Sequence, residues 1–309
     1  MKPQLMAAVG AVLDSGQYIL GPEVSAFERE FADYCETTHA VGVANGTDAL
    51  HLVLRALGVK AGDEVITAAN SFIASASSIA LAGARPVFAD IGSDLNLDPQ
   101  AVEAAITPRT KVIMPVHLAG RPARMVELLA LAERHQLIIV EDAAQAVGKV
   151  DVDVRKAGAD LLSFSGHKLY GPKGIGALYV RRKGPRVRLE PLIHGGGHER
   201  GLRSGTLNVP GIVGFAAACT LARDEMAADA RRLGALRDRL EEELLKSVAG
   251  ARGNGAGAPR LPHTTNLSFP GVDAERLLSA VSQVAASSAA ACTSSAWSSG
   301  AAMPPMCPS

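Results

Sequence analysis

The order of apolar and polar positions between residues 39 and 142 predicts alternating strands and helices. Short apolar runs, such as HAVGVA at 39–44 and LIIVED at 137–142, are typical of strands. The stretches between such runs carry apolar residues at helical spacing, as in TDALHLVLRAL at 47–57 and ARMVELLALAERH at 123–135. The same pattern predicts strands at 64–68, 85–90 and 111–117, and helices at 71–83 and 98–106, the last capped by Asp98.

These predicted strands are apolar throughout, as expected when helices cover both faces of a sheet. Their alternation with helices predicts a doubly wound, mostly parallel α/β sheet. Ligands of such sheets bind at the carboxyl ends of the strands. This rule points to four short stretches: NGTD at 45–48, NSF at 70–72, HLAG at 117–120 and EDAAQ at 141–145.

The second half of the chain has a different pattern. Two more predicted strands flank the stretch GHKLYGPKGI, and residues 207–249 are mostly helical. We therefore expect a large domain followed by a small one, with a boundary near residue 210. The predicted strands are 159–165, 176–182 and 264–269, with a flexible loop at 251–259 and a helix at 273–281. The predicted units are a helical segment 1–20, a large domain 21–209, a small domain 210–297 and a disordered tail 298–309.

Composition narrows the classes of function. The 309 residues include 31 basic and 31 acidic ones, and aromatic residues make up only 4%. This balance argues against nucleic acid or an anionic membrane as partner. No apolar run is long enough to span a membrane, and the N-terminus makes a poor signal peptide. We expect a cytoplasmic protein. Its four cysteines form no CxxC pair, so neither a metal site nor a disulfide framework is predicted.

The stretch VANGTDAL predicts a strand, a small-residue turn and a helix start. The backbone N–H groups of Gly46, Thr47 and Asp48 would then lie at a helix N-terminus, with the Thr47 hydroxyl as a further donor. Such an arrangement binds phosphate. The alternative is that Thr47 only caps the helix.

Asp142 ends a predicted buried strand, where an unpaired carboxylate is costly. It needs a cationic partner, which a protonated pyridine nitrogen, a metal or an arginine would provide. The alternative is a helix cap for the following segment.

Lys168 follows another predicted strand, in SFSGHKLYGPKGIG. A lysine in this position can form a Schiff base with a carbonyl if its surroundings lower its pKa. Ser165 and His167 can donate hydrogen bonds to the same phosphate. The alternative is an exposed loop lysine.

Together the three motifs describe a pyridoxal phosphate site of the aspartate aminotransferase type, called fold type I. Asp142 would keep the pyridine ring protonated, so that the ring can accept electrons from the substrate. Phe72 would stack on the ring, or else pack in the core. The phosphate would meet Thr47, Ser165 and His167, the ring nitrogen Asp142, the ring hydroxyl Gln145 and the aldehyde Lys168.

Two resemblances divide the chain. Residues 20–148 resemble the DegT-type nucleotide-sugar aminotransferases, on stretches such as SFIASASSIALAGARPVFADI and VEDAAQAVG. Residues 142–297 resemble the cysteine desulfurases of the class V aminotransferase family, on SFSGHKLYGPKGIGALYVRR, GGGHERGLRSGT and SSAAACTSS.

The desulfurase resemblance implies conversion of L-cysteine to L-alanine. Lys168 is then the Schiff-base lysine, and Cys292 in AACTSS is the nucleophile that receives the sulfur as a persulfide. Thr206 in RSGT would reach the phosphate of the neighbouring subunit's cofactor, which implies a homodimer. The sulfur would pass to an acceptor such as an iron–sulfur scaffold or a tRNA-modifying enzyme.

The chain also departs from the desulfurase pattern. Desulfurases carry Thr-Glu-His where this sequence has NSFIAS, with Phe72 and no histidine. Their carboxylate-binding arginine stretch is not found, and the sequence after Trp297 resembles neither family, so we expect an incomplete small domain. A desulfurase is the leading hypothesis. An aminotransferase acting on a keto-sugar nucleotide is the second, and a cofactor-binding but catalytically impaired homologue is the third.

Overall fold

A computed structural model describes residues 2–18, 26–27, 40–118, 121–144, 161–180, 195–196, 204–255, 257 and 260–281. Gln145, Cys292 and the segment 282–309 lie outside these ranges. The strands are β1 Ala40–Val43, β2 Glu64–Ala68, β3 Arg85–Ala89, β4 Thr110–Met114, β5 Ile138–Asp142, β6 Leu161–Ser165, β7 Gly176–Val180, β8 Arg252–Gly253 and β9 Leu267–Ser268. The helices are α1 Lys2–Ser15, α3 Gly46–Ala56, α4 Ile73–Leu81, α5 Pro99–Ala105, α6 Met125–His135, α8 Val209–Ser247 and α9 Ala274–Ala280, with a 3₁₀ turn η2 at Gly166–Leu169.

Seven strands form one sheet in the order β1-β7-β6-β5-β4-β2-β3. All neighbouring pairs from β6 to β3 are parallel, and β7 runs antiparallel to both β6 and β1. The predicted α/β class with a mostly parallel sheet is therefore confirmed. The carboxyl ends of β5 and β6 lie side by side, because Asp142 pairs with Ser163 in the parallel register.

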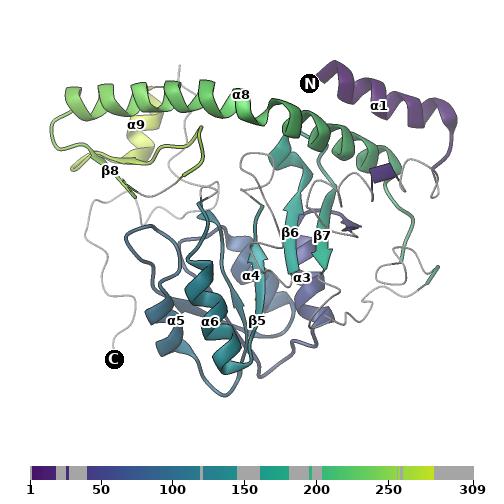
Figure 1. Cartoon of the computed structure of the whole chain (residues 1–309), viewed down its shortest axis with the longest axis horizontal. Helices are drawn as coiled ribbons and strands as arrows, with labels where there is room; N and C mark the ends of the chain where they lie inside the picture. Colours follow the sequence, from purple (N-terminus) through teal and green to yellow (C-terminus); the bar gives the residue numbers. More distant parts are fainter. Residues whose placement is uncertain are drawn as a thin grey trace.

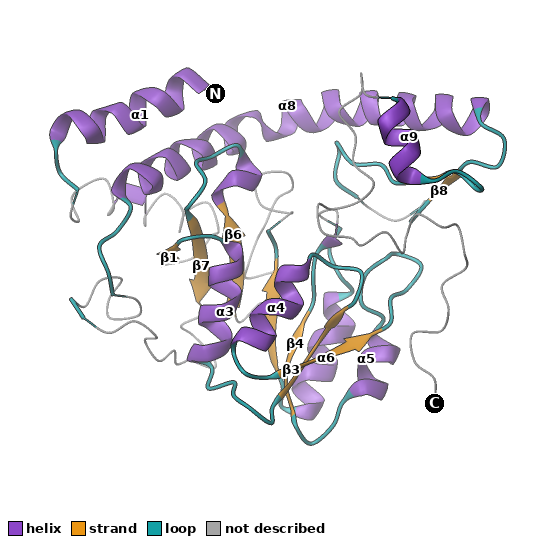
Figure 2. Cartoon of the chain, turned by 180° about the vertical axis from the view of Figure 1, so that it is seen from behind, coloured by secondary structure: helices purple, strands orange, loops and turns teal. Residues whose placement is uncertain are grey.

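Helices cover both faces of this sheet, and neighbouring residues of a strand point to opposite faces. Val65, Val112 and Val140 pack with α3 and α4 in one apolar cluster. Their neighbours Ile66 and Ile113 pack with α5 and α6 in another. Figure 1 views the sheet from the α5 and α6 side, and Figure 2 from the α3 and α4 side. Apolar runs without alternation are thus explained by burial on both faces.

The long helix α8 connects the large sheet with a smaller unit built from β8, β9 and α9 (Figures 1 and 2). Its first half packs against β6 and β7, where the rings of Phe215 and Phe27 lie 5.5 Å apart. Helix α1 lies along this same half. Arg121, from the large sheet, donates a hydrogen bond of 2.9 Å to the carbonyl of Gly255 and so joins it to the smaller unit.

Three local predictions need correction. The strand predicted at 111–117 is interrupted after Met114, because Pro115 has no N–H for the ladder, and pairing resumes only as an isolated bridge between Val116 and Asp142. Asp98 precedes α5, but its carboxylate makes no cap; it pairs instead with Arg124 Nη2 at 2.6 Å. The loop predicted at 251–259 contains strand β8, which pairs with β9.

Candidate functional site

The three predicted motifs meet at one end of the sheet, where β5 and β6 end and α3 begins. A Cβ atom placed on Gly46 would lie 3.5 Å from Ser165 Cβ and 3.8 Å from Ala144 Cβ. Helix α3, the β6 turn and the β5 end are therefore neighbours. Asp142 and Ser165 also share a face with Val140 and Leu161, which is the face that α3 and α4 cover.

The start of α3 carries a reciprocal cap that was not predicted from the sequence. Asn45 Oδ1 accepts a hydrogen bond from the Asp48 amide at 2.9 Å, and Asp48 Oδ2 accepts one from the Ala44 amide at 3.2 Å. The cap is thus Asn45 and not Thr47. The Asp48 amide is therefore occupied by Asn45, and its predicted contact with a phosphate stays a prediction. Among the described contacts, only the first-turn amides of Gly46 and Thr47 remain without a partner.

Asp142 is 7% exposed at the end of β5. Ser75 Oγ, from α4, donates to its Oδ2 at 3.2 Å, and the Ala144 amide donates to its Oδ1 at 3.3 Å. Burial raises the pKa of Asp142 above its ordinary value. The Ala144 and Ser75 hydrogen bonds oppose this rise, as does the positive charge of Lys168. The carboxylate is therefore held by two hydrogen bonds, and no described residue forms an ion pair with it.

Lys168 lies half-buried in the η2 turn that directly follows β6. The Gly171 amide closes this turn on the Gly166 carbonyl at 3.0 Å, and Tyr170 takes a left-handed backbone angle of φ 62°. The turn folds back on β7, since the Gly166 amide donates to the Ile175 carbonyl at 3.0 Å. These contacts fix the position of the lysine backbone near Asp142.

Ser165 and His167 both precede this lysine in the sequence and are hydrogen-bonded to each other. Ser165 Oγ lies 2.9 Å from His167 Nδ1. Ser165 is 4% exposed and faces the start of α3, whereas His167 is exposed. The buried hydroxyl of Ser165 therefore lies beside the start of α3, where the amides of Gly46 and Thr47 have no described partner, and the imidazole of His167 faces solvent.

The remaining predicted residues are less closely connected to this site. Phe72 immediately precedes α4 and is 37% exposed, one turn before Ser75. Thr206 is exposed in the segment that leads into α8, and its predicted contact with a neighbouring subunit stays a prediction. Gln145 and Cys292 lie outside the described residues.

Ser75, His117 and Glu141 also belong to the surroundings of Asp142, and the sequence reading assigned them no role. Ser75 is fully buried, and its place one turn after Phe72 is the signal that could have revealed it. His117 stands in the strand-end stretch HLAG, and its backbone amide donates to the Asp142 carbonyl at 3.1 Å. Its imidazole contacts Glu141.

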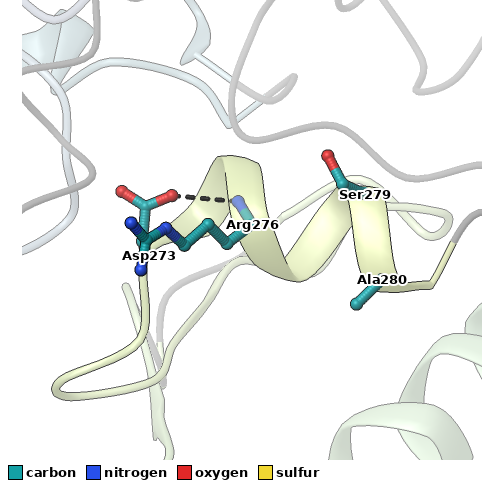
Figure 3. Close-up of a pocket in the computed structure, with 4 residues that line it drawn as sticks. All are labelled: Asp273, Arg276, Ser279 and Ala280. Atoms are coloured by element: carbon teal, nitrogen blue, oxygen red, sulfur yellow. Dashed lines mark hydrogen bonds between the residues drawn. The ribbon is translucent and has the colours of Figure 1, made fainter.

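A separate pocket lies along α9, lined by Asp273, Arg276, Ser279 and Ala280 (Figure 3). Asp273 Oδ1 accepts a hydrogen bond from the Arg276 amide at 2.9 Å, which caps the helix. None of the predicted site residues lines this pocket, so we assign it no part in the site. In the described ranges, acidic, histidine and cysteine residues form no cluster suited to a metal ion. No helix there is long and apolar enough to cross a membrane.

The residues at the sheet end fit pyridoxal phosphate. A buried carboxylate in need of a cation suits a protonated pyridine nitrogen. Two amides at the start of α3 without a described partner and the hydroxyl of Ser165, which lies beside Gly46, suit a phosphate. Lys168 supplies the amine for covalent attachment of the aldehyde.

Comparisons with known proteins agree with both sequence resemblances. Residues 1–171 match the DegT/DnrJ/EryC1/StrS aminotransferase family. The cysteine desulfurase IscS of Pseudomonas entomophila (strain L48) is 45% identical over 215 residues, which cover 69% of this chain and 53% of that protein. The chain thus spans about half the length of the curated relatives it matches.

Several solved structures are also similar to this chain in sequence and fold. DesV of S. venezuelae, in complex with a ketimine intermediate, is 35% identical with a TM-score of 0.73, over 91% of this chain and 77% of that one. DndA from Streptomyces lividans is 31% identical with a TM-score of 0.72, over 84% of this chain and 76% of that one. The chain therefore belongs to the DegT/DnrJ/EryC1/StrS aminotransferase family, which shares the pyridoxal phosphate fold, and the dependence on this cofactor, with the cysteine desulfurases.

Proposed function

We propose that this protein is a pyridoxal phosphate-dependent enzyme of the cysteine desulfurase kind, which converts L-cysteine to L-alanine and transfers the sulfur to Cys292. The observation that carries the proposal is the position of Asp142 and Lys168 at adjacent strand ends. They are close enough for the lysine charge to lower the pKa of the carboxyl group. The 45% identity to IscS over 215 residues supports the choice of reaction.

Each described residue has a role in this proposal. Asp142, held by Ser75 and the Ala144 amide, pairs with the ring nitrogen. The amides of Gly46 and Thr47 and the Ser165 hydroxyl bind the phosphate. When bound, pyridoxal phosphate supplies the electron sink that weakens bonds at the substrate Cα. Lys168 Nζ holds the cofactor and then carries the proton to and from the substrate Cα.

The sulfur step needs no external oxidant. The Cys292 thiolate attacks the sulfur of the substrate cysteine, and a sulfur–sulfur bond forms as the substrate Cβ–sulfur bond breaks. The electron pair stays on the carbon, which takes up a proton, so the products are alanine and a persulfide on Cys292. Thr206, which is exposed before α8, would complete the phosphate site of a second subunit in a homodimer.

The proposal is tested with purified protein, L-cysteine and dithiothreitol. We expect alanine and sulfide in equal amounts, and no sulfide from Cys292→Ser. Cys219→Ala serves as the matched control, because Cys219 is a buried cysteine of α8 far from the described site residues in the sequence, and we expect it to retain sulfide release. Unchanged sulfide release by Cys292→Ser would contradict the desulfurase assignment.

One observation favours a second candidate, an aminotransferase acting on a keto-sugar nucleotide. Phe72 is 37% exposed at the start of α4, where the desulfurase pattern has a histidine. The family match also covers Lys168. In this case the protein would transfer the amino group of glutamate to the keto-sugar nucleotide, and Cys292→Ser would leave that activity unchanged. Amino transfer without sulfide release would decide for this candidate.

A further inference from the structure

His117 and Glu141 form a buried pair that the proposed chemistry does not use. His117 follows β4 and is 7% exposed, and Glu141 lies in β5 and is fully buried. His117 Nε2 lies 2.9 Å from Glu141 Oε2. The other carboxylate oxygen, Glu141 Oε1, has no partner among the described residues. Among the described residues, His117 is therefore the only side chain that contacts the buried carboxyl group of Glu141.

Both nitrogen atoms of the imidazole are engaged. The Ala123 amide donates to His117 Nδ1 at 3.1 Å, so Nδ1 carries no proton. In a neutral imidazole the other nitrogen then carries it, and Nε2–H donates to Glu141. The ring is held from two sides and cannot turn without breaking one of these bonds.

This side chain is coupled to Asp142 through the backbone. The His117 amide donates to the Asp142 carbonyl at 3.1 Å, and the Asp142 amide donates to the Pro115 carbonyl at 2.9 Å. Glu141 and Asp142 are consecutive in β5, so their side chains point to opposite faces of the sheet. The pair lies on the α6 side, with Ala123, and Asp142 lies on the α4 side, with Ser75.

We propose that His117 is a positioning residue, which with Glu141 fixes the end of β5 and thereby the direction in which Asp142 presents its carboxylate to the cofactor ring. The inference rests on the proposed function, since Asp142 has this task only if pyridoxal phosphate binds. Asp142 itself meets Ser75 from α4, His117 from the segment after β4 and Lys168 from η2. Among these groups, only His117 also holds the adjacent acid.

Two variants separate the contacts of the imidazole. In His117→Gln the side-chain amide can reach Glu141, replacing Nε2–H. In His117→Asn the shorter side chain can accept the Ala123 amide but cannot reach Glu141. Ser163→Ala is the matched control, because Ser163 is buried beside Asp142 in the register and its hydroxyl has no described partner.

The measurements are the dissociation constant of pyridoxal phosphate and the pH at which the absorption of the bound cofactor changes, together with the thermal midpoint of the cofactor-free protein. We expect His117→Asn to weaken cofactor binding about tenfold and to move the absorption transition, since it breaks a buried, charge-assisted hydrogen bond. His117→Gln should restore binding to within about threefold of wild type, a small part of such a bond. Ser163→Ala should match wild type in all three measurements.

The outcomes distinguish the two proposals. If wild-type protein binds no pyridoxal phosphate, the proposed function fails and this inference fails with it. If wild type binds the cofactor, and His117→Asn and His117→Gln both match it in affinity and absorption profile, only the positioning role is overturned. If the variants lose thermal stability alone, with the affinity and the profile unchanged, the pair is purely structural and the inference is wrong.

Discussion

Ser75 Oγ on α4 donates a hydrogen bond of 3.2 Å to Asp142 Oδ2 at the end of β5. This contact joins two residues that are distant in the sequence and orients a buried carboxylate toward the face where α3 begins. Phe72 lies one turn before Ser75, so the same helix start carries both a donor to the acid and an exposed aromatic ring.

The buried state of Asp142 predicts how the cofactor-free protein responds to pH. Burial raises the pKa of Asp142 above its ordinary value of 3.8, so the folded state binds the proton more tightly than the unfolded state does. The stability linked to this proton is present at low pH and is lost as the pH rises through the raised pKa. We expect this loss in wild type but not in Asp142→Asn, as measured by urea unfolding across pH. Parallel curves for the two proteins would contradict this expectation.

Ser75→Ala tests the hydrogen bond itself. Removing the donor takes away one of the contacts that lower the pKa of Asp142 in the folded state, so the loss of stability should extend to a higher pH. At alkaline pH, where the carboxylate is charged, we expect a loss of about 1.5–3 kcal/mol in the free energy of unfolding. Ser77→Ala, in the same helix, is the control, because its hydroxyl bonds only the Ala74 carbonyl of its own helix. Equal effects of both substitutions would show that the contact with Asp142 contributes nothing.

Glu64 should cause the opposite pH dependence of stability, a loss of stability in acid. Its carboxylate accepts hydrogen bonds from Thr107 Oγ1 at 2.6 Å and Arg109 Nη2 at 2.7 Å. The Thr107 bond, followed by that of Arg109, lowers the pKa of Glu64 below its ordinary value of 4.5. The linked stability is therefore present above that pH and is lost as the pH falls through the lowered pKa. Glu64→Gln should reduce stability at neutral pH and flatten the acid side of the unfolding profile; a profile like that of wild type would exclude this role.

Substitution of Phe215 tests how much the contact between α8 and the sheet stabilises the fold. Its side chain is fully buried against β6, β7 and Phe27. Phe215→Ala should reduce the free energy of unfolding by about 3–5 kcal/mol. Leu236→Ala, in the same helix but 56% exposed, should change it by less than about 0.5 kcal/mol. Chemical denaturation of both variants checks this, and similar losses would contradict the described packing of α8.

A substitution at Gly46 should affect phosphate binding without preventing the protein from folding. A Cβ atom at this position would make ordinary contacts, the nearest at 3.5 Å, so Gly46→Ala should fold. The added methyl group would contact the side chain of Ser165, whose hydroxyl is assigned to the phosphate. We expect the variant to lose about tenfold in affinity for pyridoxal phosphate, the effect of about one charge-assisted hydrogen bond, and to bind pyridoxal as wild type does. Titration with both compounds measures this, and an equal loss for both would argue against phosphate at this helix start.

Most of the fold could be predicted from the sequence because both faces of the sheet are covered by regular elements. Runs such as EVITA at 64–68 are buried along their whole length, and the β2 bounds agree with the prediction. The direction of β7 could not be predicted, since it depends on pairing with β1, which comes from a distant part of the chain. The early end of β4 at Met114 follows from Pro115, whose missing N–H interrupts a pattern that apolarity alone would continue.

The candidate site could be predicted only in part. The positions of Asp142 and Lys168 at strand ends follow from the strand pattern and from their motifs. The strand pattern does not show which backbone amides are available to bind phosphate. The Asp48 amide, for example, already donates to the side chain of Asn45 at the start of the same helix. Ser75 and the pair of His117 and Glu141 acquire their roles only through tertiary contacts, which no local pattern specifies.

The most direct test of the account is the identity of the lysine that holds the cofactor. Protein incubated with pyridoxal phosphate is reduced with borohydride, digested and mapped by mass spectrometry. The account predicts modification of Lys168, which is half-buried beside Asp142, and none of Lys173, which is exposed in the next turn of the same loop. A cofactor found on Lys173, or spread over exposed lysines with Lys168 unmodified, would contradict it.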